Sequence, residues 1–254
     1  MDRYERLKKK LSNREPIIGT HFHMINSPAM IEKIDQPWLD FFLLDTEHGV
    51  FSNEGITNML QVMRLIGLPS VVRVPVPEYQ CIARAIDLGA DGILIPRTET
   101  LEQVKTAIGA MRFTPRGVTG HGGYIQMRPG ETYDEFQNNR MLFVQIESPK
   151  GIDNLPAMLE QYGKEIAGII IGPYDLSSTM GMFKRFDDPV FIANVKKTFD
   201  IGISHGKTVG IFCDNKEQAA KYRALGANLL WMCTEEEMYI AGMNAELRPF
   251  VESC

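Results

Sequence analysis

Short apolar runs alternate along the chain with longer segments in which apolar residues recur at helical spacing. The short runs are rich in β-branched and aromatic side chains and predict strands. They span residues 16–20, 41–45, 71–74, 92–96, 141–147, 167–171, 208–212 and 228–232. Both faces of these runs are apolar, as in a parallel sheet that has helices on one side and packed side chains on the other. The pattern therefore predicts repeated βα units.

Helix boundaries are expected in the gaps between these strands. Ser27 precedes a proline, and Ser52 precedes an asparagine and a glutamate, which is the pattern of a helix start. Gly89 and Gly226 each end a helical segment just before a strand. A glycine at such a position adopts a positive φ that stops the helix. The repetition of this helix end supports a barrel of alternating strands and helices.

One segment, residues 112–140, interrupts the alternation. It contains a glycine-rich stretch at residues 116–123 and a short helical piece near residues 133–139. A long connection of this kind is usually a functional loop or an oligomer contact, and it has no character of an interdomain linker. We therefore predict an α/β fold in one domain over residues 1–254, a (β/α)8 TIM barrel. An extra C-terminal helix should begin at Glu235 and needs a surface on which to pack.

Composition and charge exclude several classes of protein. The 254 residues include 27 basic and 32 acidic side chains, a net charge of −5, which argues against nucleic-acid and membrane-surface partners. The chain has no apolar run of about 18 residues and no apolar N-terminal segment, so a cytoplasmic location is expected. The cysteines show no zinc-site spacing and are interpreted as reduced, mostly structural thiols. They are Cys81, Cys213, Cys233 and Cys254.

Active sites of (β/α)8 barrels lie at the carboxyl ends of the strands, so polar residues at those ends are the candidates for chemistry. They are Asp45 and His48 after the second strand, Arg73 on the third, Gln145 and Glu147 on the fifth, and Asp175 after the sixth.

Glu147 and Asp175 are the candidate metal ligands. Gln145 and Glu147 lie two residues apart on a strand and so share one face. A carboxylate that points into the barrel needs a counter-charge, and oxygen ligands suit Mg2+ or Mn2+ better than zinc. The alternative is a structural ion pair in which Arg73 neutralises the acid. Arg73 itself needs an anionic partner, either Glu147 or a substrate carboxylate.

His48 is a candidate general base near neutral pH, especially if a carboxylate orients its imidazole. The alternative is a solvated loop histidine. His21 and His23 follow the first predicted strand in the His-x-His pattern of metal-dependent hydrolases, but no predicted strand carries a histidine. Lys150, in a loop, and Lys207, at the beginning of a strand, are poorly placed for a Schiff base. Acids after the last two strands argue against a phosphorylated substrate.

Five segments, in this order, resemble the HpcH/HpaI family of metal-dependent pyruvate aldolases, which includes hydroxy-oxo-heptanedioate and 2-dehydro-3-deoxyglucarate aldolases. The resemblance extends from Gly19 to the last strand. The segments are residues 45–48 (Asp-Thr-Glu-His), 72–75 (Val-Arg-Val-Pro), 87–90 (Asp-Leu-Gly-Ala), 144–148 (Val-Gln-Ile-Glu-Ser) and 172–177 (Gly-Pro-Tyr-Asp-Leu-Ser).

The resemblance implies a class II aldolase that cleaves a 4-hydroxy-2-oxo acid to pyruvate, or a related 2-oxo acid, and an aldehyde. Glu147 and Asp175 would bind Mg2+ or Mn2+, with Co2+ as an alternative. His48 would accept the proton, and Arg73 would stabilise the transition state. Gln145 and the backbone around Tyr174 would contact the substrate.

The resemblance also implies a homo-oligomer, a hexamer built as a trimer of dimers, in which the C-terminal helix packs on a partner barrel. Asp87 matches the acid that raises the basicity of the histidine. Because Asp87 lies near a helix C-terminus, it can reach His48 only from another subunit. Asp45 is a closer, competing partner for His48 within the chain.

The chain departs from the family pattern at Gly49 and Val50, where Ala-Pro is common, and at His21, His23, Arg97 and Tyr174. These departures leave the aldehyde open, and acceptor specificity is expected at His21, Arg97 and residues 116–123. Two further interpretations stay open: a CoA-ester lyase of the malyl-CoA type, and a non-catalytic barrel that binds a metal or another ligand.

Overall fold

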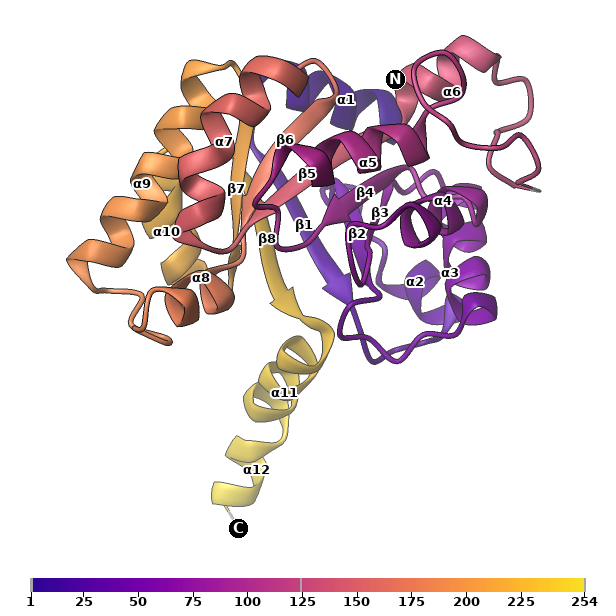
Figure 1. Cartoon of the computed structure of the whole chain (residues 1–254). Coiled ribbons are helices and arrows are strands. Elements are labelled where there is room, and N and C mark those ends of the chain that lie inside the picture. Colours follow the sequence, from indigo (N-terminus) through magenta and orange to yellow (C-terminus); the bar gives the residue numbers. More distant parts are fainter. Residues whose placement is uncertain (1, 124, 254) are drawn as a thin grey trace.

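Eight parallel strands close into a barrel in which each strand pairs with the next one along the chain and β8 pairs with β1 (Figure 1). This computed structural model describes residues 2–123 and 125–253. The strands are β1 (Ile17–Phe22), β2 (Phe41–Asp45), β3 (Ser70–Arg73), β4 (Gly92–Ile95), β5 (Met141–Ile146), β6 (Ile166–Ile171), β7 (Thr208–Cys213) and β8 (Leu229–Thr234). The predicted (β/α)8 barrel is confirmed, and the ends of its strands differ from the predicted ends by at most two residues.

Helices cover the outside of the barrel and close one of its ends (Figure 1). They are α1 (Arg3–Asn13), α2 (Pro28–Ile34), α3 (Asn53–Leu65), α4 (Tyr79–Asp87), α5 (Leu101–Met111), α6 (Tyr133–Asn139), α7 (Pro149–Tyr162), α8 (Pro173–Thr179), α9 (Pro189–Ser204), α10 (Lys216–Ala224), α11 (Glu235–Glu246) and α12 (Arg248–Glu252). Helix α1 packs Tyr4, Leu7 and Leu11 into the same core as the inward side chains of the strands. It therefore closes the amino-terminal end of the barrel.

The strand period of two decides which polar residues face inward. Leu43, Val71 and Phe143 are buried in the core inside the barrel. Because side chains alternate between faces, the residue two positions further along each strand points inward as well. Those residues are Asp45, Arg73 and Gln145. The apolar interior thus gives way to polar groups at the carboxyl ends of the strands.

Local signals place most helix boundaries as predicted. The Ser52 hydroxyl accepts a hydrogen bond from the amide of Gly55 at 3.1 Å and caps α3. Gly89 and Gly226 have φ angles of 106° and 116° and end their helices as expected. Ser27 precedes α2 but its side chain makes no capping hydrogen bond. Lys150, expected in a loop, lies in the first turn of α7.

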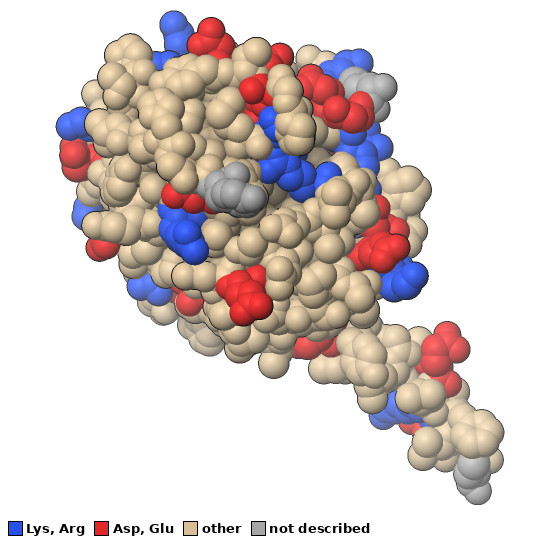
Figure 2. Space-filling view, turned by 90° about the vertical axis from the view of Figure 1, so that its right-hand side faces the viewer, with Lys and Arg blue, Asp and Glu red and all other residues tan. Residues whose placement is uncertain are grey.

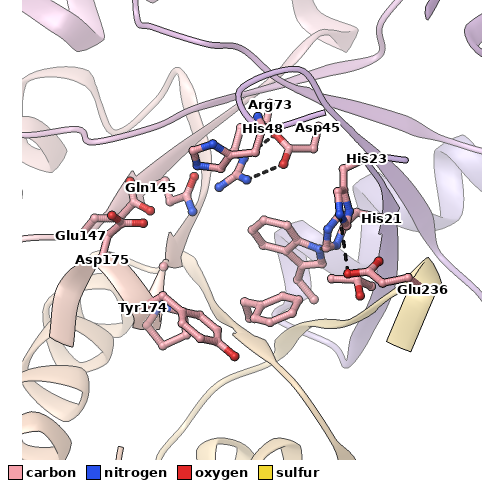
Figure 3. A pocket seen from close by; sticks show the side chains of 15 residues that line it. His21, His23, Asp45, His48, Arg73, Gln145, Glu147, Tyr174, Asp175 and Glu236 are labelled. Carbon is pink, nitrogen blue, oxygen red and sulfur yellow. Dashed lines mark hydrogen bonds and ion pairs between the residues drawn. The ribbon is translucent and has the colours of Figure 1, made fainter. Parts of the chain in front are cut away.

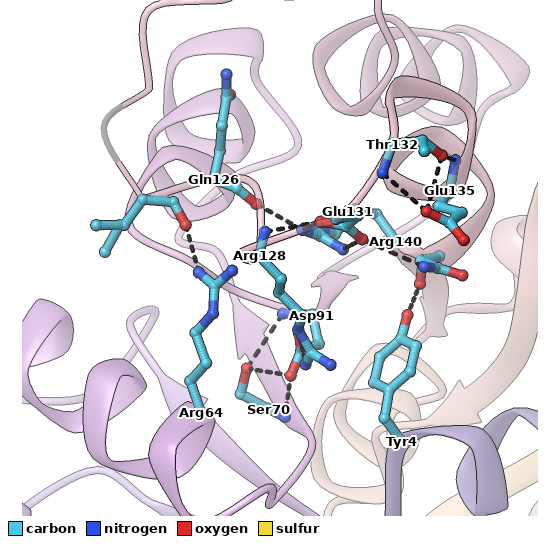
Figure 4. A network of polar contacts seen from close by, with 12 residues as sticks. Tyr4, Arg64, Ser70, Asp91, Gln126, Arg128, Glu131, Thr132, Glu135 and Arg140 are labelled. Atoms are coloured by element: carbon cyan, nitrogen blue, oxygen red, sulfur yellow. Dashed lines mark hydrogen bonds and ion pairs between the residues drawn. The ribbon is translucent and has the colours of Figure 1, made fainter. Parts of the chain in front are cut away.

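The connection between α5 and β5, residues 112–140, lies at the amino-terminal end of the barrel. It runs from the end of a helix to the start of a strand, and connections of that kind lie opposite the carboxyl ends. Polar contacts hold it there (Figure 4): Arg128 pairs with Asp91, which also accepts a hydrogen bond from the amide of Ser70, and Arg140 pairs with Glu131. The short helix predicted within this connection is α6, with the predicted bounds.

The C-terminal segment departs from barrel geometry. Helices α11 and α12 project away from the barrel (Figure 1 and Figure 2). Beside β8 and β1 lies an apolar groove of about 480 Å³, lined among others by Phe22, Trp38 and Met238. The extra C-terminal helix is confirmed, and α11 contacts β1, β8 and α12.

Cys81, Cys213 and Cys233 are unpaired, whereas Cys254 lies outside the described residues. Within residues 2–123 and 125–253, the helices are too short or too polar to cross a membrane.

Candidate active site

A cavity of about 320 Å³ opens at the carboxyl ends of the strands. Its walls include every candidate site residue except Asp87 (Figure 3). Those residues are Asp45, His48, Arg73, Gln145, Glu147, Tyr174 and Asp175. Figure 3 shows Glu147 and Asp175 next to each other on one side, His48 and Arg73 above, and two histidines on the opposite side.

The two candidate metal ligands form an acidic corner, and neither carboxylate has an ion-pair partner among the described residues, since Arg73 pairs with Asp45 and Glu47. Glu147 is 3% exposed, and one of its carboxylate oxygens accepts a hydrogen bond from the backbone amide of Arg97 at 2.8 Å. Burial raises the pKa of Glu147 to about 8, and the charge of Asp175 adds to this rise. The side-chain oxygen of Gln145 is buried and has no hydrogen-bond partner among the described residues.

These three oxygen-bearing side chains fit a hard divalent cation. A cation would neutralise the paired carboxylates and would give the orphaned amide oxygen of Gln145 a partner. Gly172 makes the corner possible, because a Cβ at this position would lie 2.2 Å from a carboxylate oxygen of Glu147. Gly172 was part of the sequence pattern but was not predicted as a site residue.

Arg73 is held by Asp45 and not by Glu147. Its Nε donates to Asp45 Oδ1 at 2.9 Å and its Nη2 to Asp45 Oδ2 at 2.5 Å. Burial alone would lower the pKa of Arg73, but the hydrogen bonds and charge of Asp45 raise it. The alternative of an ion pair between Arg73 and Glu147 is not supported, because the strand register places Asp45 beside Arg73 and the guanidinium binds Asp45.

His48 lies at the rim of the cavity with 56% of its side chain exposed. Its Nε2 lies 3.8 Å from a carboxylate oxygen of Glu47, which also lies 3.4 Å from Arg73 Nη1. Asp45 accepts hydrogen bonds from the backbone amides of Glu47 and His48, at 3.0 and 3.4 Å. Asp45 thus positions the turn that carries His48, while Glu47 is the carboxylate beside its imidazole.

Glu47 is a functional candidate that sequence reasoning missed. The sequence offered one indication: Glu47 immediately precedes His48 in the polar segment that follows the second strand. Burial raises the pKa of Glu47, while the charge of Arg73 opposes that rise.

Asp87 is not brought to His48 within one chain. It is the last residue of α4 and lines a different cavity, together with Gly123 and Ile125. A Cβ at Gly123 would lie 2.2 Å from an Asp87 carboxylate oxygen, so the connection at residues 112–140 covers this acid. Burial raises the pKa of Asp87. A contact with His48 from a neighbouring subunit stays a prediction.

The wall opposite the acidic corner contains two histidines. His21 lies on β1 and not after it, whereas His48, His121 and His205 lie outside the strands, as expected. Its Nδ1 accepts a hydrogen bond from Trp231 Nε1 at 2.7 Å, and burial lowers its pKa to about 4. His21 is therefore neutral near pH 7 and carries its proton on Nε2. Trp231, which sequence reasoning missed, forms part of the cavity wall with Phe212.

His23 lies beside Glu235, with 3.1 Å between Nδ1 and a carboxylate oxygen. His21, His23 and Glu235 each offer a ligand atom within 4.8 Å of the others. The hydrogen bond from Trp231 uses the lone pair of His21 Nδ1, however, and leaves Nε2 protonated. The group is therefore a poorer cation site than the acidic corner.

The other expected specificity residues take different positions. Arg97 has an exposed side chain whose Nε lies 3.7 Å from Glu47, and only its backbone amide reaches Glu147. Tyr174 lines the cavity, but its hydroxyl donates to Asp214 at 2.7 Å. Residues 116–123 lie at the opposite end of the barrel, because they belong to a helix-to-strand connection. Their expected acceptor role at this chain's own cavity is therefore wrong.

Residues 20–240 match the family model described as HpcH/HpaI aldolase/citrate lyase. The chain is 30% identical over 231 residues to the 5-keto-4-deoxy-D-glucarate aldolases of Shigella dysenteriae serotype 1 (strain Sd197) and Escherichia coli O157:H7 (strain EC4115 / EHEC). Each match covers 89% of this chain and 88% of the relative.

Solved structures with the same fold include an HpcH/HpaI aldolase from Desulfitobacterium hafniense DCB-2, with a TM-score of 0.85 and 24% identity over 97% of this chain and 95% of the other. A HpcH/HpaI aldolase/citrate lyase family protein from Burkholderia cenocepacia J2315 has a TM-score of 0.87 and 24% identity, covering 96% and 98% of the two chains. The citrate synthase SbnG has a TM-score of 0.84 and 23% identity, covering 97% and 98%. At this identity the structures support the fold alone.

Proposed function

Because this chain belongs to the HpcH/HpaI aldolase/citrate lyase family, we propose that it is a metal-dependent class II aldolase. It reversibly cleaves a 4-hydroxy-2-oxo acid to pyruvate, or a related 2-oxo acid, and an aldehyde. The observation that carries this proposal is the division of the cavity: Glu147 and Asp175 form an acidic corner, and Arg73 and His48 line the same cavity. A negative 2-oxo acid and a divalent cation complement these two parts.

Glu147 and Asp175 would hold the cation, Mg2+ or Mn2+ with Co2+ as an alternative. When bound, it would supply Lewis-acid chemistry for the 2-oxo acid. Gln145 lies in the same wall and positions the oxygen-rich end of the substrate. Gly172 keeps the space beside Glu147 open for this end.

His48 accepts the proton of the 4-hydroxyl group in the cleavage direction. The electrons of that O–H bond form the carbonyl of the aldehyde as the C3–C4 bond breaks. The electrons of the broken bond move into the pyruvate unit, giving an enolate that is then protonated at C3. Arg73, held rigid by Asp45, stabilises the negative oxygen without having to reorganise. The carboxylate of Glu47 lies 3.8 Å from His48 Nε2.

The aldehyde half faces the wall of His21 and His23. His21 presents a neutral Nε2–H donor there, fixed by its hydrogen bond with Trp231. Such a donor suits a hydroxyl or carbonyl oxygen of a polar aldehyde. The relatives named as 5-keto-4-deoxy-D-glucarate aldolases support a sugar-acid substrate of this kind.

The protein acts in the cytoplasm as a homo-oligomer, a hexamer built as a trimer of dimers. Helix α11 exposes Tyr239, Ile240 and Met243, and the apolar groove beside β8 and β1 is lined by side chains of these strands, of α2 and of the start of α11. These two surfaces complement each other if α11 of one subunit packs on the barrel of its partner. Such an assembly also allows Asp87 of one subunit to approach His48 of another.

The test is release of pyruvate from 4-hydroxy-2-oxo acids by the purified chain. With Mg2+ or Mn2+ we expect turnover, with EDTA we expect loss of turnover, and excess metal should restore it. Glu147→Gln should lower kcat by about 100-fold or more, because it removes a charged ligand. Glu102→Gln removes an exposed carboxylate from α5 and serves as the matched control.

Activity that survives complete metal removal, or an unchanged rate in Glu147→Gln, would contradict this function. Turnover of CoA thioesters in place of 2-oxo acids would favour a CoA-ester lyase. Bound metal without turnover of any tested 2-oxo acid would favour a non-catalytic barrel.

A further inference from the structure

A second polar cavity, of about 300 Å³, lies at the amino-terminal end of the barrel. Its walls come from the end of α1, from α6, and from the starts of β5, β6 and β7. It shares no lining residue with the cavity at the carboxyl ends. Six basic side chains line it: Lys8, Arg112, Arg116, Arg140, Lys164 and Lys207. The acid in the same lining is Glu165.

Buried donors in this cavity lack partners. Arg112 is 4% exposed; its Nε donates to Glu165 and its Nη2 to the carbonyl oxygen of Arg140, each at 3.0 Å. Its Nη1 is buried and has no hydrogen-bond partner among residues 2–123 and 125–253. Arg140 is 3% exposed and its Nε is likewise unpartnered within those residues. A buried guanidinium N–H without a partner is costly, so these atoms point to an anionic ligand.

The positive charge of the cavity exceeds the negative charge around it. Glu165 is shared between Arg112 and Arg116, and Glu131 pairs with Arg140 from outside the lining. Lys164 and Lys207 form no ion pair with a described residue. Lys207 donates to the carbonyl oxygen of Ile166 at 3.0 Å and is partly buried. In a chain whose net charge is −5, this local excess of cations is not explained by overall composition.

We propose that this cavity binds a small anion that carries two or more negative charges, a phosphate monoester or a polycarboxylate. Guanidinium groups match phosphate and carboxylate oxygens geometrically, and Arg112 and Arg140 in the lining each have one N–H group without a partner among the described residues. Lys164 and Lys207 add charge at the more open side. The volume admits a metabolite of a few carbon atoms and excludes a polymer as a fully enclosed ligand.

The experiment is isothermal titration of the full chain, treated with EDTA and kept in a buffer free of phosphate and carboxylates. Inorganic phosphate and citrate are the two probes, and sodium chloride at equal ionic strength is the reference. We expect at least one probe to bind with a dissociation constant of about 1 mM or lower. The same probe should raise the melting temperature, since it binds the folded chain.

The double variant Lys164→Gln/Lys207→Gln should weaken that binding by about tenfold or more, because it removes two cations from the cavity. Neither lysine belongs to the ion pairs that hold residues 112–140, so the variant should fold, and its circular dichroism melt checks this. Lys105→Gln/Lys216→Gln removes the same charge from α5 and α10 and should bind as the wild type does. Arg73→Lys alters the other cavity and should also leave binding unchanged.

Binding of phosphate alone identifies a phosphate ligand, and binding of citrate alone identifies a polycarboxylate. Binding of both shows that the cavity selects for multiple charge. No heat and no rise in melting temperature with either probe at about 10 mM overturns the proposal. Equal binding by the Lys164→Gln/Lys207→Gln variant overturns it as well.

Discussion

At the scale of single residues, the charged side chains of the cavity differ in how well they are neutralised. Arg73 and Asp45 neutralise each other through two hydrogen bonds. Glu147 is buried like Asp45, but it accepts its hydrogen bond from the backbone amide of Arg97, and burial raises its pKa to about 8. This difference supports a cation at Glu147 and a fixed anion-stabilising role for Arg73.

Gly172→Ala should impair the acidic corner without unfolding the barrel. The new Cβ would lie 2.2 Å from a carboxylate oxygen of Glu147, so the carboxylate must move. We expect metal affinity and kcat to fall by about tenfold or more, since small displacements of ligands are costly. Calorimetric titration with Mn2+ and the pyruvate-release assay measure the two effects.

Gly109→Ala is the matched control, because a Cβ there meets its nearest neighbour at 3.8 Å. If Gly172→Ala binds metal as tightly as the wild type does, the close approach of the Gly172 backbone to the Glu147 carboxylate has no functional importance.

His21 should make the stability of the fold sensitive to acid. Burial lowers its pKa from 6.5 to about 4, so the unfolded chain binds a proton at a higher pH than the folded chain does. The contribution of neutral His21 to the unfolding free energy is fully present above pH 6.5 and is lost as the pH falls towards 4. The loss amounts to about 3 kcal/mol of unfolding free energy.

Urea unfolding at several pH values between 7 and 4 measures how steeply the unfolding free energy falls as the pH is lowered. His21→Gln removes the titrating group, so its unfolding free energy should fall less steeply with acid than that of the wild type. Parallel pH profiles for the two proteins would contradict the assignment of this slope to His21.

Part of the site could be predicted from sequence because it depends on local rules. Gln145 and Glu147 share a face through the period of a strand, and Asp175 directly follows the neighbouring strand. Glu47 and Trp231 could not be assigned this way. Their roles depend on contacts with Arg73, His48 and His21, which come from three different strands or turns.

At the scale of elements, the alternation of strands and helices predicted the barrel, since each βα unit has its own hydrophobic period and end signals. The direction of α11 could not be predicted, because it depends on which surface receives the helix. The place of residues 112–140 follows from their position between a helix and a strand. That rule puts them at the amino-terminal end, away from the acceptor side where we expected them.

Charges on α11 should disrupt the assembly. In Tyr239→Glu/Met243→Glu two apolar side chains of this helix become acidic, so the helix should no longer pack on an apolar groove. We expect the wild type to be a homo-oligomer and the variant to shift to smaller species, as measured by light scattering after gel filtration.

Val190→Glu places a charge at an exposed valine of α9 and should leave the assembly unchanged. A monomeric wild type, or a double variant of unchanged mass, would be incompatible with packing of α11 on a partner barrel.

At the scale of the whole molecule, the two ends of the barrel carry different polar cavities. The carboxyl end combines an acidic corner with Arg73 and His48, as expected for a family aldolase. The amino-terminal end gathers basic side chains around Arg112. The net charge of −5 is therefore the sum of two differently charged ends of the barrel.

The most direct test of the aldolase mechanism is exchange of the methyl protons of pyruvate for deuterium, because it needs the cation, the base and Arg73 but no aldehyde. Proton NMR in D2O should show the methyl signal decaying with wild-type protein and Mg2+ or Mn2+. The decay should stop with EDTA, resume with excess metal and be slowed about 100-fold in Glu147→Gln. Exchange that continues unchanged without metal, or no exchange by the metal-loaded wild type, would contradict the account.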